Sequence, residues 1–365
     1  MIKKIKWNNH KILGNLELDF SKPDGSIYNT IILAGENGTG KTTILETLSA
    51  FLNLGSIECF EYINYFIDDI SYTVRPAKKG SNFGFHIRTN DSDGSSKQIT
   101  SNRNNNFDTI KSDDADIRHY GVSYSKARSG FNTKKVTSTT TKQIDSEKYE
   151  SDTNEDFTSI KQLLVDISTQ DNSEWMNITK SGTNVTFSAF QQSSKMFRFE
   201  TAFNNFFGSL QFKGVDSTDP SELKVLFEKH GKQISIDELS TGEKQIVFRG
   251  THLLKNINNI SGGIVLIDEP ELSMHPKWQQ KVLQYYRTLF NKNGTQDVQI
   301  IVATHSQYVL TSALEDRGDV LIIAFDDNNG TIAQKRITAP AVLPTITSAE
   351  TNYLAFGILS SDYHI

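Results

Sequence analysis

The chain has few of the features that mark secreted or membrane proteins. Its 365 residues include a single cysteine, Cys59, so no disulfide can form within the chain. Such a low cysteine content is typical of proteins in a reducing cytosol. No stretch approaches the roughly 20 apolar residues of a membrane span, and no apolar signal-peptide core follows the Met-Ile-Lys-Lys-Ile-Lys start. We therefore expect a cytoplasmic protein with no membrane partner.

An excess of positive charge is missing as well. The formal net charge is −5, which argues against a general attraction to nucleic acid but leaves room for a local basic patch. We expect a solvated, flexible loop near residues 126–155, a polar tract with several basic side chains. These are Lys126, Arg128, Lys134, Lys135 and Lys142. They suit an acidic partner or a nucleic acid, but the sequence favours a solvated loop whose charges have no specific role.

A glycine-rich stretch is the strongest feature present. It fits the pattern G-x-x-x-x-G-K-[ST] and consists of Gly35, Glu36, Asn37, Gly38, Thr39, Gly40, Lys41, Thr42 and Thr43. The apolar run 30–34 before it predicts a buried strand, and apolar residues after it recur at helical spacing. A chance match in a glycine-rich turn would lack these flanks. We predict a nucleotide phosphate site in which Lys41 reaches the β- and γ-phosphates and the Thr42 hydroxyl ligates Mg²⁺.

Strands and helices alternate in the last third of the chain. The expected strands are 263–268, 298–303 and 319–325, and the expected helices are 276–290 and 306–314. This alternation predicts a mainly parallel sheet covered on both faces, with its site at the carboxyl ends of the strands.

The remaining segments have weaker secondary-structure patterns. Residues 2–20 predict two strands, and 223–236 predicts a hairpin. We expect a discontinuous core of 1–55 and 220–340, an inserted lobe at 56–215, and a C-terminal tail at 341–365. Within the lobe we expect a strand at Ile117–Tyr124 and helices at 156–170 and 187–208. No heptad pattern persists there, so a long coiled-coil arm is excluded.

Two adjacent carboxylates follow one of the buried strands. Asp268 and Glu269 come directly after Ile264–Ile267, and such a pair is costly unless a cation is bound. Mg²⁺ near Asp268, with Glu269 polarising a water, accounts for the pair better than two solvated acids. His305 ends a neighbouring strand, and we predict that it contacts the γ-phosphate or the water. His275 is a weaker candidate because Pro276 suits the first turn of a helix.

A second helix start carries an unusual glycine. The stretch Ser240, Thr241, Gly242 and Glu243 contains a capping box, with Ser240 at the N-cap and Glu243 three residues on. Gly242 is a poor helix former, so we expect something to need its bare backbone, and a phosphate group is our candidate. Because residues 35–42 already bind one nucleotide, a second anion site suggests a nucleotide shared between two copies of the chain.

Together these motifs resemble those of the ABC ATPase superfamily. Gly35–Thr43, Leu239–Gln245, Ile264–Glu271 and Thr304–Ser306 look like its Walker A, signature, Walker B and switch-histidine motifs. The sequences of these motifs are similar to those of the OLD/SMC-like branch. Within that branch they resemble the stand-alone bacterial AAA family ATPases of phage-defence loci, which include the Septu-type and retron-associated ATPases. Ser-Thr-Gly-Glu stands where transporter ATPases have Ser-Gly-Gly-Gln, which weakens a transporter reading.

The resemblance implies an α/β P-loop NTPase fold: an ABC-type ATPase head with a mainly parallel sheet, an N-terminal antiparallel β lobe and a helical, polar insertion. It implies the cofactors ATP and Mg²⁺ and a homodimer with ATP between the protomers. Lys41 and Thr42 of one chain then face Ser240 and Gly242 of the other. Asp268 supports Mg²⁺, Glu269 is the general base and His305 senses the γ-phosphate.

Several points stay open at this stage. The Q-loop glutamine is unassigned, with Gln191 and Gln192 as candidates by position alone. No nuclease motif follows the core, so an effector such as a nuclease is expected to be a separate protein. The rival readings are a clamp or scaffold that barely hydrolyses ATP, and the energising subunit of a transporter or a DNA-repair machine.

Overall fold

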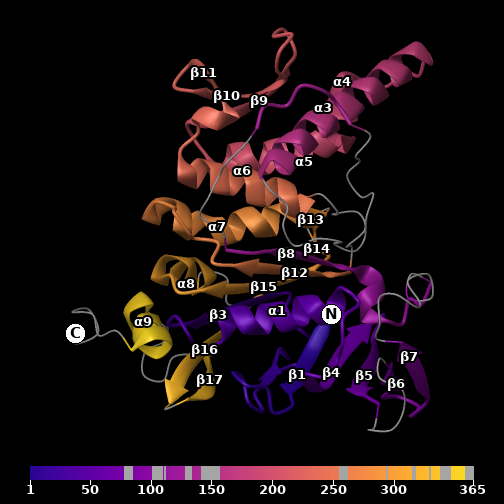
Figure 1. Ribbon diagram of the computed structural model, residues 1–365, viewed down its shortest axis with the longest axis vertical. Helices are drawn as coiled ribbons and strands as arrows, with labels where there is room; N and C mark the ends of the chain where they lie inside the picture. The colour runs from indigo at the N-terminus through magenta and orange to yellow at the C-terminus, as the bar shows by residue number, and fades with distance from the viewer. Residues whose placement is uncertain are drawn as a thin grey trace. The chain divides into compact units, whose positions relative to one another are not determined.

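The computed structural model describes residues 1–77, 85–100, 110, 112–127, 134–140, 157–254, 262–292, 295–314, 318–328, 330–337 and 347–357. The chain divides into two compact units (Figure 1). The first comprises Met1–Ala127, Asn259–Pro270 and Lys292–Ile365, and the second comprises Arg128–Asn258 and Glu271–Asn291. Each unit is described by itself.

The first unit is built on a six-stranded sheet of order β17-β16-β3-β15-β12-β8. Its strands are β17 (Thr331–Ile337), β16 (Val320–Asn328), β3 (Thr30–Gly35), β15 (Gln299–Thr304), β12 (Ile264–Asp268) and β8 (Val122–Ser125). All neighbours pair in parallel except β17, which is antiparallel to β16. Continuous apolar runs form the central strands because both faces of such a sheet are buried. The mainly parallel sheet predicted from the sequence is confirmed.

A second, antiparallel sheet of order β2-β1-β4-β5-β6-β7 belongs to the same unit. Its strands are β2 (Glu17–Asp19), β1 (Ile2–Trp7), β4 (Phe60–Ile67), β5 (Ile70–Pro76), β6 (Phe85–Asn90) and β7 (Ser96–Thr100). Helix α1 (Lys41–Leu52) lies between the two sheets (Figure 1). One apolar core joins all three layers, through residues such as Trp7 and Tyr65 of the antiparallel sheet, Leu45 and Phe51 of α1, and Leu266 of the main sheet.

Three shorter elements complete this unit. The 3₁₀ helix η1 (Ile117–Tyr120) leads into β8, and helices α8 (Gln307–Leu314) and α9 (Ser348–Phe356) contact each other and strands β3 and β16. The described part of the expected C-terminal tail, α9, therefore packs on the core. The strand expected at Ile117–Tyr124 is half wrong, because a carboxylate oxygen of Asp116 accepts a hydrogen bond from the Arg118 backbone and starts a 3₁₀ turn instead.

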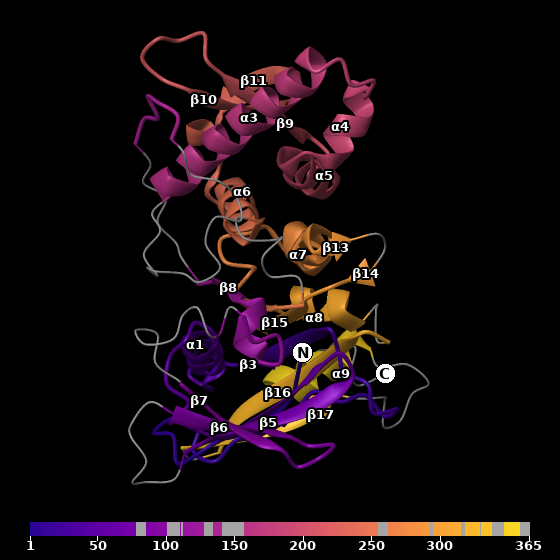
Figure 2. The ribbon, with the colours of Figure 1, turned by 90° about the vertical axis from the view of Figure 1, so that its right-hand side faces the viewer.

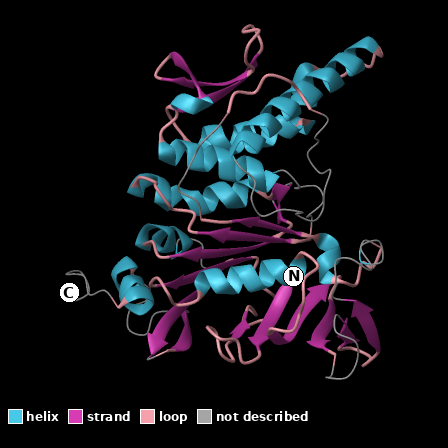
Figure 3. Cartoon of the chain, in the orientation of Figure 1, coloured by secondary structure: helices cyan, strands magenta, loops and turns pink. Residues whose placement is uncertain are grey.

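The second unit is mainly helical (Figure 3). Its helices are α3 (Phe157–Lys180), α4 (Phe187–Ser193), α5 (Lys195–Phe206), α6 (Thr241–Leu254) and α7 (Pro276–Leu289), with the 3₁₀ helix η2 (Ile236–Glu238). A three-stranded antiparallel sheet has the order β11-β10-β9 and comprises β11 (Lys232–Ser235), β10 (Lys224–Lys229) and β9 (Leu210–Asp216). Helix α3 contacts α5 and α6, and α5 contacts α7 (Figure 2). The phenylalanines of α5 and the adjoining Phe207 pack among one another and against Trp278 of α7, as expected for core aromatics.

The structure differs from the sequence-based expectation in three further boundaries. The helix expected over 156–170 continues to Lys180. The helix expected over 187–208 is two helices, because the Ser194 hydroxyl accepts from Phe197 N and starts α5 anew. The expected lobe of 56–215 is shared between the units: β4 to β8 complete the sheets of the first, whereas α3 to β9 belong to the second. Most of the expected flexible loop near 126–155 lies outside the described residues. The short strands β13 (Asn291–Lys292) and β14 (Thr295–Gln296) connect α7 to β15.

None of the described helices is long and apolar enough to cross a membrane.

Candidate nucleotide site

The glycine-rich loop connects β3 to α1, as the motif requires. Three of its glycines have positive φ: Gly35 (153°), Gly38 (92°) and Gly40 (82°). A Cβ on Gly35 would lie 2.6 Å from the Phe325 carbonyl oxygen, and one on Gly40 would lie 2.6 Å from Leu13 Cδ2. The Phe325 carbonyl therefore excludes a side chain at Gly35, and the positive φ disfavours one at Gly40, so the loop backbone can approach an anion beside the start of α1.

The lysine of the motif folds back onto this loop. Lys41 is buried, and its Nζ donates to the carbonyl oxygens of Gly35 (2.8 Å) and Glu36 (2.7 Å). Thr39 Oγ1 also donates to the Glu36 carbonyl, at 2.8 Å. The ammonium group is thus held at the mouth of the loop, where a bound phosphate oxygen can replace a carbonyl as its acceptor.

A magnesium-type ligand pair joins α1 to β12. Thr42 Oγ1 lies 3.1 Å from each carboxylate oxygen of Asp268, which is itself only 4% exposed. Among the described residues no group of three or more His, Cys, Asp and Glu side chains gathers as a metal site. Mg²⁺ commonly binds to one or two protein oxygens together with water and phosphate, and Thr42 with Asp268 offers such oxygens.

The second carboxylate of the pair faces a histidine. His305 Nδ1 lies 3.3 Å from Glu269 Oε1, and both side chains are partly exposed. The Glu269 backbone is left-handed, with φ of 45°, and its N–H donates to the Ala303 carbonyl on the adjacent strand β15. Since this conformation is unfavourable for a residue with a Cβ, the neighbouring strand fixes the direction in which the carboxylate leaves β12. The structure therefore brings together Lys41, Thr42, Asp268, Glu269 and His305 within the first unit.

The predicted signature residues lie in the second unit, at the start of α6. The capping box is present: Ser240 N donates to Glu243 Oε2 (2.8 Å), and Glu243 N donates to Ser240 Oγ (3.4 Å). Lys229 Nζ also donates to Glu243 Oε1, at 2.7 Å. Burial raises the pKa of Glu243, but the hydrogen bonds from Lys229 and Ser240 outweigh it and leave the pKa below its usual value. Glu243 is therefore a structural anion that fixes the helix start.

Packing within the second unit explains why residue 242 is a glycine. A Cβ there would lie 2.8 Å from the Ser273 carbonyl oxygen and 3.1 Å from the Trp278 ring. Close packing of α6 against the start of α7 accounts for the glycine without a ligand. The inference that this glycine needs a phosphate is therefore weakened.

The weaker candidates have structural roles or lie elsewhere. His275 is the N-cap of α7, where its Nδ1 accepts from Lys277 N at 3.2 Å. Gln191 and Gln192 belong to helix α4 of the second unit, whereas both neighbours of the acid-bearing β12, strands β15 and β8, belong to the first unit. Sequence reasoning missed the carboxyl end of β8, because it assigned the residues after this strand to a flexible loop.

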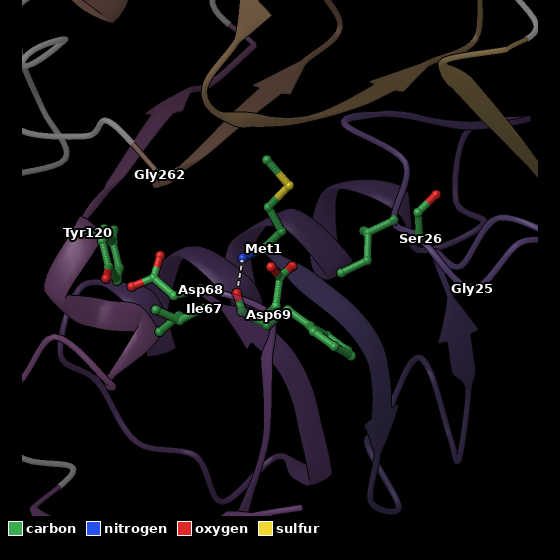
Figure 4. A pocket seen from close by; sticks show the side chains of 10 residues that line it. Met1, Gly25, Ser26, Ile67, Asp68, Asp69, Tyr120 and Gly262 are labelled. Atoms are coloured by element: carbon green, nitrogen blue, oxygen red, sulfur yellow. Dashed lines mark hydrogen bonds between the residues drawn. The ribbon is translucent and has the colours of Figure 1, made fainter. Parts of the chain in front are cut away.

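The first unit contains a cavity of about 560 Å³ at the amino ends of strands β3, β8 and β12. Asp68 and Asp69, from the β4–β5 turn, line it together with Met1 and Tyr120 (Figure 4). The Met1 amino group donates to the Phe66 carbonyl at 2.7 Å, and burial lowers its pKa to about 5. None of the predicted nucleotide-site residues lines this cavity, so it is not the predicted site.

A family model described as "AAA domain, putative AbiEii toxin, Type IV TA system" matches residues 31–311. The chain belongs to this AAA-domain family. The match runs from the strand of the glycine-rich loop to helix α8, and so contains every residue of the predicted site. Membership supports an ATP hydrolase with an ABC-like ATPase fold.

Similar proteins agree with this assignment. The chain is 37% identical over 98 residues to the "Retron Vc95 probable ATPase" of Vibrio cholerae, covering 24% of this chain and 18% of that protein. It is 28% identical over 116 residues to the "Septu protein PtuA" of Bacillus thuringiensis, covering 29% and 27%. The matched segments thus span less than a third of these relatives. Among solved structures, an Smc head bound to the C-terminal winged-helix domain of ScpA is similar in fold, with a TM-score of 0.50 and 16% identity over 92% of this chain and 98% of that one.

Proposed function

We propose that this AAA-domain protein binds ATP with Mg²⁺, hydrolyses it, and works as a head-to-tail homodimer. Its nucleotide state would regulate a separate effector, a nuclease or toxin, in bacterial antiphage defence. The observation that carries the ATPase proposal is the convergence of Lys41, the Thr42–Asp268 pair and the Glu269–His305 pair at the carboxyl ends of β3, β12 and β15.

Each of these groups has one task in hydrolysis. The loop N–H groups and Lys41 bind the phosphates, and Thr42 with Asp268 would hold Mg²⁺, which would neutralise charge on the phosphate oxygens. Glu269 takes a proton from the attacking water, and its left-handed backbone points the carboxylate out of the strand. His305, held at 3.3 Å, orients Glu269 and donates to the γ-phosphate.

The dimer rests on the start of α6. Ser240 and Gly242 sit at a helix N-terminus, which favours an anion. We infer that this end of one protomer meets the γ-phosphate bound by the other. Ser240 Oγ donates to Glu243 at 2.8 Å, so a nucleotide would have to replace that acceptor, and this exchange would make dimerisation dependent on ATP.

The effector and the defence role rest on resemblance. The relatives include a retron ATPase and a Septu protein, and the chain spans a small part of each. The rival readings, a clamp with little turnover and an energising subunit of a transporter or repair machine, are outcomes of the same tests.

The ATPase proposal is tested by steady-state phosphate release from wild type, Glu269→Gln and Lys41→Ala. Glu58→Gln is the matched control, because Glu58 is an exposed acid outside the site. We expect Glu269→Gln to bind ATP but to release phosphate about a hundredfold more slowly or worse, and Lys41→Ala to lose binding. Equal rates for wild type and Glu269→Gln would favour the clamp.

The dimer is tested by sizing chromatography with ATP and Mg²⁺. Glu269→Gln should accumulate as an ATP-bound dimer, and Lys41→Ala should not. A monomer in both cases would refute the shared-nucleotide arrangement while leaving the ATPase result standing.

A further inference from the structure

Strand β8, at the edge of the five parallel strands, also ends at the site. Strands β3, β15 and β12 deliver the loop, His305 and the two carboxylates at their carboxyl ends. Strand β8 runs parallel to β12, with Ile267 opposite Ser125. One residue further on, Lys126 follows Ser125 as Asp268 follows Ile267, and adjacent strands lie about 4.8 Å apart. Lys126 therefore begins next to the metal-site carboxylate.

The side chain of Lys126 lies on the face of the sheet that carries α1. Tyr124 and Leu266 belong to the core shared with α1, whereas their neighbours Ser125 and Ile267 do not. Because successive strand residues alternate faces, Lys126 and Asp268 share the α1 side. Two contacts agree with this: Asp268 meets Thr42 of α1, and Lys126 Nζ lies 5.5 Å from the centroid of the Tyr124 ring.

The charges of the site give this lysine a role. Asp268 and Glu269 are both acids, and a nucleoside triphosphate adds further negative charge. Among the described residues that directly follow the five parallel strands, Lys126 is the only one with an ammonium group. Lys41, at the start of α1, is on the opposite side of Asp268's strand, beside β3. The γ-phosphate would therefore lie between two lysines from different elements.

We propose that Lys126 binds the γ-phosphate from the β8 side and makes the site prefer a triphosphate over a diphosphate. This rests on the proposed nucleotide function. Lys126 is half-buried and its Nζ lies over the Tyr124 ring, so the side chain is already restrained and its ammonium can donate a charge-assisted hydrogen bond to a phosphate oxygen at little ordering cost. An amide at this place would supply neither the charge nor the preference.

The test compares equilibrium binding of a non-hydrolysable ATP analogue and of ADP, each with Mg²⁺. Lys126→Met keeps the apolar stem over Tyr124 and removes the charge. We expect the Kd for the ATP analogue to rise roughly tenfold to a hundredfold and that for ADP to change little. Lys126→Arg should restore most of the preference, since it keeps a cation at the site.

Lys3→Met is the matched control. Lys3 Nζ also lies over an aromatic ring, at 4.9 Å from the centroid of Phe66, but on β1 and outside the site. Equal losses for ATP analogue and ADP in Lys126→Met, or no loss in either, would overturn the inference and leave the ATPase proposal intact. If wild type binds neither the ATP analogue nor ADP, the inference about Lys126 and the ATPase proposal both fail.

Discussion

Glu269 Oε1 and His305 Nδ1 lie 3.3 Å apart although their strands are separate in the sequence. Parallel pairing of β12 with β15 sets Asp268 opposite Ala303, and the Glu269 N–H then donates to Ala303. Each side chain leaves its strand just beyond this bond. The pair is therefore a product of sheet register, and it shows why a strand that carries the acid needs the strand that carries the histidine beside it.

The backbone of Glu269 predicts a trade between stability and activity. Its φ of 45° is unfavourable for a non-glycine residue. Glu269→Gly should relieve this and raise the free energy of unfolding by up to about 1 kcal/mol, while removing the base and with it hydrolysis. Glu269→Gln should also lose hydrolysis, but its free energy of unfolding should not rise. Urea denaturation and phosphate release on the same preparations check this. A glycine variant less stable than the glutamine variant would contradict the strain argument.

Gly242 predicts a defect that precedes any dimer. A Cβ at this position would meet the Ser273 carbonyl at 2.8 Å and Trp278 at 3.1 Å. Gly242→Ala should therefore destabilise the second unit by about 1–3 kcal/mol, without nucleotide and at low protein concentration. Tryptophan fluorescence during denaturation, to which Trp278 contributes together with Trp7 and Trp175, is the readout. Gly208→Ala is the control, because nothing lies within 4 Å of its Cβ position. If Gly242→Ala unfolds like wild type but fails to dimerise, the glycine serves the ligand instead.

Much of the nucleotide site could be predicted from the sequence because its information is local. The glycine-rich loop, the acids after β12 and the capping box of α6 are each fixed by a few adjacent residues and the element they terminate. The parallel sheet followed from alternation of strands and helices. The SMC-head-like fold is confirmed.

What the sequence could not supply was the pairing of distant segments. That β8 lies beside β12 depends on sheet register, and the four-residue strand carries too short a pattern to show it. The division of residues 56–215 between two units depends on long-range packing in the same way. The packing of Gly242 on Trp278 likewise joins α6 to α7, so a local helix rule alone suggested a ligand.

A buried histidine predicts acid sensitivity in the first unit. His86 is fully buried and faces Arg118, Asp116 and Arg88, and burial together with the arginines lowers its pKa to about 3. In the unfolded chain the pKa is about 6.5. Between these values the unfolded state binds the proton and the folded state does not, so lowering the pH favours unfolding. From pH 7 to 5 this residue should cost about 2 kcal/mol of stability.

Replacing the histidine should flatten this dependence. His86→Gln keeps a hydrogen-bonding group near Arg118, which lies 3.5 Å away through its Nη2, and it does not titrate. Its stability should change less than that of wild type between pH 7 and pH 5, as measured by urea denaturation at each pH. His230→Asn, at an exposed histidine with positive φ, is the control and should keep the wild-type slope. Parallel slopes for wild type and His86→Gln would place the acid sensitivity elsewhere.

The buried lysine of α3 predicts that α3 is coupled to the start of α6 within the second unit. Lys161 Nζ contacts Asp237 of η2 at 2.6 Å and Glu222 at 3.2 Å, and the lysine side chain is 2% exposed. Lys161→Met would remove this cation from the half-buried Glu222, which should cost about 2–4 kcal/mol. The value lies toward the lower end because Asp237 is partly solvated and Lys135 Nζ lies 3.8 Å from Glu222. Adding Glu222→Gln should recover part of the loss, whereas Lys232→Met, at an exposed lysine of β11, should cost little.

Because Asp237 lies three residues before Ser240, Lys161→Met should also weaken ATP-dependent dimerisation more than it weakens ATP binding. Full recovery of stability in the double variant without recovery of the dimer would assign the lysine to positioning the start of α6. Equal stability of Lys161→Met and Lys232→Met would remove the basis for both effects.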